Sequence, residues 1–313
     1  MKQLFTITLI LISTLSAFTQ TDTTAVPFVS YWSIGDSYDF KITKVEQKWK
    51  QGEQTKNDTT GYTVNFLVLD STETSYRIKW SYETQWADYG IPEEYVEQFS
   101  KYNITEVIYK TSEVGDFVEI ENWEEISEMM GNLFNELLDM MSESPDVDRK
   151  DLSNVMKPLM DIYQTKEGIE YVIFKELQYF HFPMGIEYTV GETLRYEEQL
   201  PNMLGGDPIK GNSSIYIESV DFDEGFCVLI QDMELDPDDM SDMIYHYFKK
   251  AKLGNKEMKK MMKDAKIELN DHNRFEYYYY PGIPYYIETH RETIIEISGQ
   301  SGKRVDITMI ELL

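Results

Sequence analysis

The sequence predicts an α+β protein: a large, strongly curved antiparallel β-sheet, or unclosed barrel, with two long amphipathic helices packed on its concave face. Segments of alternating polar and apolar residues recur along the chain, and this period of two is typical of half-buried strands. Two other segments carry apolar residues at three- and four-residue spacing, which is typical of amphipathic helices. Gly-, Asn-, Asp- and Ser-rich turns separate the predicted strands, which indicates an antiparallel meander.

The N-terminus predicts export. Lys2 precedes an apolar run over residues 4–12 and small residues up to Thr19, a pattern typical of a secretory signal peptide. We expect cleavage after Thr19, so residues 1–19 form the signal peptide and 20–30 a short polar leader. No Cys follows the apolar run, which excludes a lipid anchor there. The predicted location is periplasmic or secreted, with no transmembrane segment in the mature chain.

The composition limits the partners. The 313 residues include 56 acidic and 29 basic side chains, a formal charge of −27. Nucleic acids are bound through Lys and Arg contacts to phosphates, so nucleic-acid binding is excluded. Hydrophobic residues make up 42% and aromatic residues 14% of the chain, which is far above the content of disordered acidic chains. We therefore expect one folded domain over residues 31–313.

In the first half, strands are predicted within residues 35–45, 61–70, 75–83, 104–110 and 115–120. Asn122 is a favourable helix N-cap, and acidic residues follow in the first turn. The long helix that begins there is expected to end before residues 143–146, and a shorter helix is expected at 151–162. In the second half, strands are predicted at 169–182, 191–200, 266–280, 283–298 and 303–312, and a hairpin that turns at residues 223–225 is predicted at 213–235. The second long helix is expected at 236–265.

The two halves share a pattern that predicts an internal duplication. The stretch "GDSYDFKI" from Gly35 resembles "GETLRYEE" from Gly191, and a long helix follows strands in each half. The repeat would comprise residues 31–165 and 166–313. The alternative is an unrelated similarity between amphipathic strands.

Motifs for catalysis or cofactor binding are not found. The Asp residues of 236–242 lack the glycine and glutamate of a calcium loop, and we interpret them as a helix N-terminus. The four His residues lack metal-ligand spacing. We expect a non-enzymatic protein without catalytic residues, metal or cofactor. A hydrolase is the less favoured alternative, because abundant carboxylates make any chosen pair uninformative.

The predicted function is binding of an apolar or amphipathic ligand, such as a lipid or an acylated molecule, in the cell envelope. Met side chains can adapt to varied apolar ligands, and alternation places two tyrosines of "EYYYYPG" on one strand face. The predicted lining residues are Met129, Met130, Leu133, Phe134, Met243, Tyr247, Tyr277 and Tyr279. A cavity smaller than about 300 Å³ would contradict this prediction. The alternative is a structural or protein-interaction module with a filled core and an acidic surface.

A family resemblance points to the same fold. The order of signal peptide, curved sheet, helix, sheet, helix and closing strands resembles the periplasmic lipoprotein-carrier-like unclosed β-barrels. Gly35–Ile42 and Gly115–Trp123 also resemble motifs shared by uncharacterised secreted proteins of Gram-negative bacteria. The resemblance implies an unclosed barrel and, by analogy of fold alone, a lipid carrier. It supplies no catalytic residues.

Overall fold

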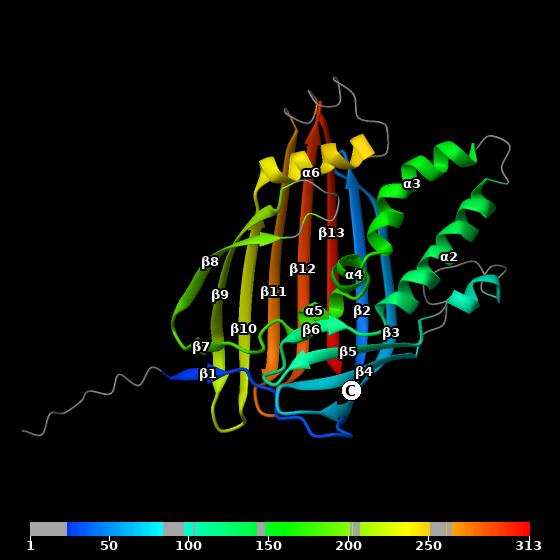
Figure 1. Ribbon diagram of the computed structural model, residues 1–313. Coiled ribbons are helices and arrows are strands. Elements are labelled where there is room, and N and C mark those ends of the chain that lie inside the picture. Colours follow the sequence, from blue (N-terminus) through cyan, green and yellow to red (C-terminus); the bar gives the residue numbers. More distant parts are fainter. Residues whose placement is uncertain are drawn as a thin grey trace, which may run out of the picture.

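The computed structural model describes residues 24–83, 97–102, 104–142, 148–200, 202, 207–250, 261 and 265–313. The predicted signal peptide and most of the C-terminal half of the helix predicted at 236–265 lie outside the described residues. A single antiparallel sheet of eleven strands forms the wall of the molecule, and the helices lie on one side of it or at its ends (Figure 1).

The sheet has the strand order β6-β5-β4-β3-β2-β13-β12-β11-β10-β9-β8, so β6 and β8 are its edges and the barrel is unclosed, as predicted. A separate two-stranded sheet pairs β1 with β7. The strands are β1 (Ala25–Pro27), β2 (Ser37–Lys50), β3 (Glu53–Ser71), β4 (Ser75–Glu83), β5 (Glu106–Ser112), β6 (Phe117–Ile120), β7 (Glu187–Thr189), β8 (Thr193–Leu200), β9 (Ile209–Asp221), β10 (Phe226–Leu235), β11 (Lys266–Tyr278), β12 (Ile283–Ile297) and β13 (Gln300–Leu312).

Two meanders meet at the centre of the sheet. Strands β2 to β6 follow one another on one side, strands β8 to β13 follow one another on the other, and β2 pairs with β13 in the register Phe40 to Leu312. The helix α6 interrupts the second meander between β10 and β11, whereas α2 follows the last strand of the first. The predicted duplication stays a prediction.

The helices are short or lie at the periphery. They are η2 (Ser100–Tyr102), α2 (Trp123–Met141), α3 (Arg149–Tyr163), α4 (Lys166–Gly168), the π-helical turn η3 (Ile169–Ile173), α5 (Lys175–His181) and α6 (Pro237–Lys250). Helix α2 packs against the core through Ile126 and then runs away from the sheet beside α3 (Figure 1). Helix α6 lies across β9 and β11 at one end of the sheet.

The helix inside the concave face is α5, and the prediction of a strand at 169–182 was wrong. This segment is rich in aromatic and β-branched residues, which favour strands. Its buried residues Phe174, Leu177 and Phe180, followed by Met184 just beyond the segment, nevertheless recur at the three- and four-residue spacing of a helix. Burial against the sheet on that one face overrides the strand propensity. Helix α5 therefore occupies the position on the concave face where the two long helices were predicted.

Phe180 is the centre of the core. Its ring is fully buried and lies 5.2 Å from Phe40, 5.4 Å from Phe66 and 5.3 Å from Trp80, measured between ring centroids. The Tyr277 hydroxyl donates to the Phe180 carbonyl oxygen, so β11 also holds α5. Burying an aromatic side chain of this size contributes several kcal/mol.

The residues predicted as a polar leader enter the core instead. Val26 and Phe28 are fully buried, and the Phe28 ring lies 5.6 Å from that of Tyr277. The indole of Trp32 donates to the carbonyl oxygen of Gly282 at 3.3 Å. Gly282 has a φ of +90°, and a Cβ there would lie 2.7 Å from the Val29 carbonyl oxygen. The start of the described chain therefore closes the sheet end at the β11–β12 turn.

Replacement of Phe180 by Ala should lower the free energy of unfolding by about 3–5 kcal/mol, because it leaves a cavity between α5 and the sheet. Urea denaturation followed by circular dichroism measures the change. The matched control is Phe222→Ala at a half-exposed turn position, with an expected effect within about 0.5 kcal/mol. Equal losses in both variants would contradict the central role of Phe180.

Candidate functional site

A cavity of about 340 Å³ lies between α5 and the inner face of the sheet. Its walls come from α5, β8, β10, β11 and β12, with the β5–β6 turn at one side. The residues that line it are Asp116, Phe117, Gln178, Tyr179, His181, Phe182, Glu198, Leu200, Gln231, Met233, Asp271, Asn273, Phe275 and Arg291. The site is amphipathic, because aromatic and aliphatic side chains alternate with buried polar groups.

The floor of the cavity is a set of polar side chains that point inward from the strands. Arg291 Nε and a terminal nitrogen donate to the two carboxylate oxygens of Asp271 at 2.6 and 2.5 Å. Asn273 Nδ2 donates to Gln231 Oε1 at 2.5 Å. Asp271, Asn273 and Gln231 are 4–6% exposed, and buried polar groups of this kind require such partners. The inner face of β11 therefore changes from apolar to polar and back within a few residues.

Gln178 on α5 supplies an unpaired donor. Its Nε2 is buried and has no hydrogen-bond partner in the described part of the chain, and the residue lines the cavity. An unsatisfied buried donor costs about 1–3 kcal/mol. A ligand with an acceptor oxygen in the cavity would remove that cost.

The apolar wall is aromatic in large part. The rings of Phe182 and Phe275 stack with centroids 5.0 Å apart, and Met233 and Leu200 extend the wall toward β8. Such surfaces contact the hydrocarbon part of an amphipathic ligand.

His181 lines the cavity, but its ring nitrogens are already engaged. Nδ1 donates to the Gly115 carbonyl oxygen at 2.7 Å, and the Tyr109 hydroxyl donates to Nε2 at 2.9 Å. Burial lowers the pKa of His181 to about 3. The imidazole is therefore neutral at physiological pH and is a poor general base. Its role is to tie α5 to β5 and to the turn before β6.

Lys175 and Tyr179 lie one helical turn apart on α5 beside this floor. The Lys175 amine lies 5.0 Å from the Tyr179 ring centroid. Burial, and secondarily the nearby positive charge of Arg291, lowers the pKa of Lys175 to about 7. A substantial fraction of these amines is therefore uncharged at neutral pH.

The eight predicted lining residues are placed in separate regions. On α2, Met130 packs against the main core, whereas the Phe134 ring lies 5.3 Å from that of Tyr163 on α3. Met129 and Leu133 are half-buried on the same helix. None of these four residues lines the cavities described in this section.

The other predicted residues are similarly divided. Met243 on α6 packs against a second apolar cluster, and the Tyr247 hydroxyl on the same helix donates to the Val155 carbonyl oxygen on α3 at 3.4 Å. Tyr277 lies in the centre of the core and Tyr279 packs against it. The residues missed from the sequence are Asp271, Asn273 and Arg291. The sequence did contain a signal for this site: Asp271 and Asn273 occupy inward positions of the strand between the apolar residues Leu269 and Phe275.

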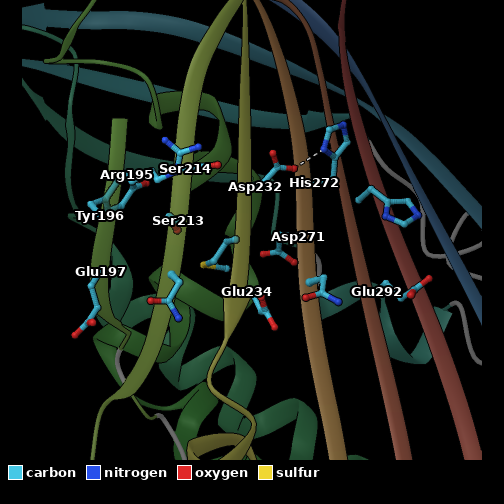
Figure 2. Close-up of a pocket in the computed structure, with 14 residues that line it drawn as sticks. Arg195, Tyr196, Glu197, Ser213, Ser214, Asp232, Glu234, Asp271, His272 and Glu292 are labelled. Carbon is cyan, nitrogen blue, oxygen red and sulfur yellow. Dashed lines mark hydrogen bonds and ion pairs between the residues drawn. The ribbon is translucent and has the colours of Figure 1, made fainter. Parts of the chain in front are cut away.

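A larger concavity of about 810 Å³ lies on the outer face of the same strands. Figure 2 shows the side chains that line it, including Asp232 and His272, whose carboxylate oxygen and Nδ1 are 2.7 Å apart. These two side chains are 50% and 62% exposed. Exposed pairs contribute about 0–1 kcal/mol, and most of the side chains that line this concavity are charged or polar. We therefore place the candidate site in the inner cavity.

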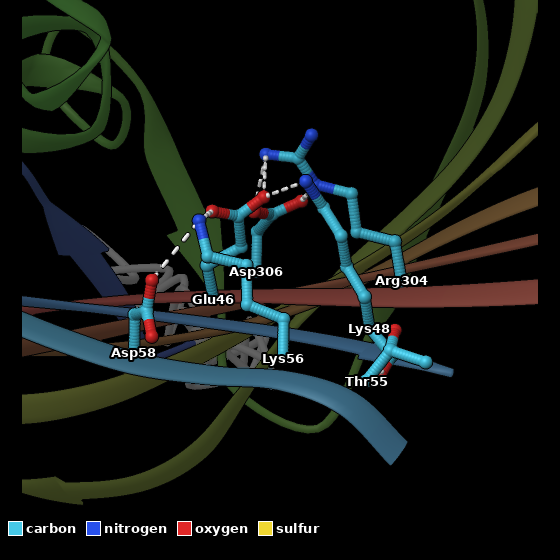
Figure 3. A network of polar contacts seen from close by, with 7 residues as sticks. All are labelled: Glu46, Lys48, Thr55, Lys56, Asp58, Arg304 and Asp306. Atoms are coloured by element: carbon cyan, nitrogen blue, oxygen red, sulfur yellow. Dashed lines mark hydrogen bonds and ion pairs between the residues drawn. The ribbon is translucent and has the colours of Figure 1, made fainter. Parts of the chain in front are cut away.

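A third concavity, of about 360 Å³, lies over β2, β3 and β13 and is occupied by ion pairs. Glu46 contacts Lys56 at 2.5 Å, Lys48 at 2.6 Å and Arg304 at 3.3 Å (Figure 3). Hydrogen bonds from Lys48 and Lys56 lower the pKa of Glu46 to about 2. Arg304 also binds Asp306 through two hydrogen bonds of 2.7 and 2.8 Å. These charged side chains are paired with one another, so few of their charges are available to bind a ligand.

The cluster of Asp residues at 236–242 forms a helix N-terminus, as interpreted from the sequence. Asp236 Oδ1 accepts from the amides of Asp238 and Asp239 at 2.9 and 3.2 Å. Within the described residues, no three His, Cys, Asp or Glu side chains gather closely enough to hold a metal ion. None of the helices in the described ranges has the length and apolar character needed to span a membrane.

Comparisons with known proteins leave the family open. No protein family and no curated protein matches the chain. A solved structure of lipovitellin that addresses lipid–protein interactions aligns with 90% of this chain at 8% identity and a TM-score of 0.43. The chain spans about a quarter (25%) of the lipovitellin chain. An outer membrane channel of Pseudomonas putida F1 aligns with 91% of this chain and 98% of its own, at 5% identity and a TM-score of 0.15. At such low TM-scores and identities, nothing about the ligand or the location of either protein can be transferred to this chain.

Replacement of Asp271 by Ala should destabilise the protein by about 3–5 kcal/mol, because the largely buried Arg291 would lose its counter-charge. The partners' side chains are 4% and 29% exposed. Chemical denaturation at pH 7 measures the loss. The control is Asp161→Ala, which breaks the exposed Lys157–Asp161 pair and should cost less than about 1 kcal/mol.

Stability should fall as pH decreases below about 6.5, in part because of His181. The unfolded chain binds a proton on this residue near pH 6.5, whereas the folded chain does so only near pH 3. Within that window the loss attributable to His181 approaches about 1.4 kcal/mol per pH unit. Urea midpoints at pH 7 and pH 5 measure it.

The variants for this test are His181→Gln and His272→Gln. The wild type should lose more stability between pH 7 and pH 5 than His181→Gln, since Gln does not titrate. His272, which is exposed, provides the control and should behave as the wild type. Parallel pH profiles for the wild type and His181→Gln would contradict the assignment.

Proposed function

We propose that this protein binds a small amphipathic ligand in the cavity between α5 and strands β8 to β12. The observation that carries the proposal is the buried Gln178 Nε2, which has no partner among the described residues and lies at a cavity of about 340 Å³ with a polar floor and an aromatic wall. The volume lies at the lower end of the range for ligand pockets, about 300–1,000 Å³. It corresponds to roughly ten water molecules at about 30 Å³ each.

The proposal narrows the ligand class expected from the sequence. A volume of this size suits a short-chain amphiphile better than a complete lipid. The ligand would place an acceptor oxygen near Gln178 and its apolar part against Phe182 and Phe275. Export by the signal peptide predicted at residues 1–19 belongs to the same proposal, and the ligand would then be met outside the cytoplasm. We propose a binding role without catalysis, since the imidazole at the site is neutral and fully hydrogen-bonded.

A protein-interaction module is the second candidate function. The packing of α5 favours it, because Phe180 and its neighbours fill the apolar part of the concave face. The acidic surface, with a formal charge of −27, would then meet a cationic partner. High salt should weaken such an interaction.

Octanol is a suitable first probe, because it combines a short apolar chain with one hydroxyl. Isothermal titration calorimetry of the mature protein should show saturable binding at one site. Met233→Trp should abolish it by filling the cavity, and Gln178→Leu should weaken it several-fold through loss of the amide donor. Met309→Trp, on the outer face of β13, is the matched control. Binding that survives Met233→Trp, or no binding by the wild type, would refute this site.

A further inference from the structure

The charges around the inner cavity are unbalanced. Three carboxylates line it, those of Asp116, Glu198 and Asp271, whereas Arg291 has the only guanidinium or ammonium group among the described lining residues. The Lys175 amine lies beside the floor, over the Tyr179 ring, and is not part of the lining. Arg291 is engaged by Asp271 in a two-hydrogen-bond pair. Asp116 and Glu198 are therefore the carboxylates left over, which gives the described lining an excess of two negative charges.

Neither leftover carboxylate has a cationic partner in the described part of the chain. Glu198 Oε1 accepts a hydrogen bond from the Ser213 hydroxyl at 2.6 Å, which is a neutral donor. Desolvation raises the pKa of Asp116, and no nearby cation offsets this effect. By contrast, Glu197, the neighbour of Glu198 on the outer face, forms an ion pair with Lys210 at 2.7 Å. The protein thus pairs the outward glutamate and leaves the inward one available.

Aromatic rings surround the same space. The aromatic residues that line the cavity are Phe117 on β6, Tyr179 on α5, Phe182 directly after α5 and Phe275 on β11. The faces of such rings carry partial negative charge and attract ammonium groups, with about 0.5–2 kcal/mol for each favourable contact. Carboxylates together with aromatic faces form a common chemical environment for organic amines. An anionic head group would instead meet like charges and a guanidinium that is already paired.

We infer that the ligand is an organic cation that also carries an acceptor oxygen. Its ammonium group is bound by Asp116, Glu198 and the surrounding aromatic rings, its oxygen accepts from Gln178, and its apolar part contacts Phe182 and Phe275. This inference rests on the proposed ligand-binding function of the cavity. It excludes free fatty acids and phosphate-bearing lipids as preferred ligands.

Three probes with the same chain and different head groups test the inference: octylamine, octanol and octanoate. Isothermal titration calorimetry at pH 7 and low salt should rank them in that order of affinity, with octylamine about tenfold tighter than octanol, since one charge-assisted contact contributes about 1.4 kcal/mol. Glu198→Gln should weaken octylamine about tenfold and change octanol less than about twofold. Glu197→Gln is the matched control and should leave all three affinities unchanged.

The outcomes separate the two proposals. Equal affinities for octylamine and octanol, or a preference for octanoate, would overturn the cation while leaving the amphiphile site in place. Equal weakening of all three probes by Glu198→Gln would show that this side chain only supports the cavity, and would also overturn it. If none of the probes binds, the ligand site itself is refuted and the inference with it.

Discussion

The insertion of α5 into the curved sheet is the constraint on which the rest of the structure depends. The edge strands β6 and β8 of the eleven-stranded sheet do not pair, so the sheet does not close into a barrel. Another element must therefore cover its inner face. Phe180 provides that cover by contacting rings from β2, β3 and β4. Hydrogen bonds through Tyr277 and His181 then fix the helix to β11 and β5.

The cavity is a consequence of how short that helix is. With seven residues, α5 is only about 10 Å long at 1.5 Å per residue. This length is shorter than that of the strands whose inner face it covers. Beside it the inner face becomes polar. Asp271 pairs with Arg291 and Asn273 with Gln231, while Gln178 Nε2 has no partner among the described residues. Buried ion pairs can often be replaced by apolar residues without loss of stability, so a polar set at this position agrees with the proposed role in ligand binding.

The sheet could be predicted from the sequence, because long alternating strands leave a clear period of two. The helix at its centre could not be predicted so directly. Residues 169–182 combine strand-favouring side chains with a helical spacing of buried positions, and only contacts distant in sequence decide between them. The site was missed for a related reason. The predicted lining residues were chosen because Met and Tyr side chains suit apolar ligands. The cavity is instead lined by polar residues such as Asn273, at strand positions where the alternation predicts a buried side chain.

The pairing of β2 with β13 bears on how the chain reaches its fold. Phe40 is opposite Leu312, and Phe28 packs on Tyr277, so segments near residue 30 find their partners about 250–270 residues later. Until then, β2 has an exposed edge and Phe28 lacks its contact with Tyr277. If the chain crosses a membrane from its N-terminus, these segments arrive long before the residues that cover them. Uncovered apolar segments would persist during such a passage, and maturation would then be more sensitive to aggregation than the finished structure suggests.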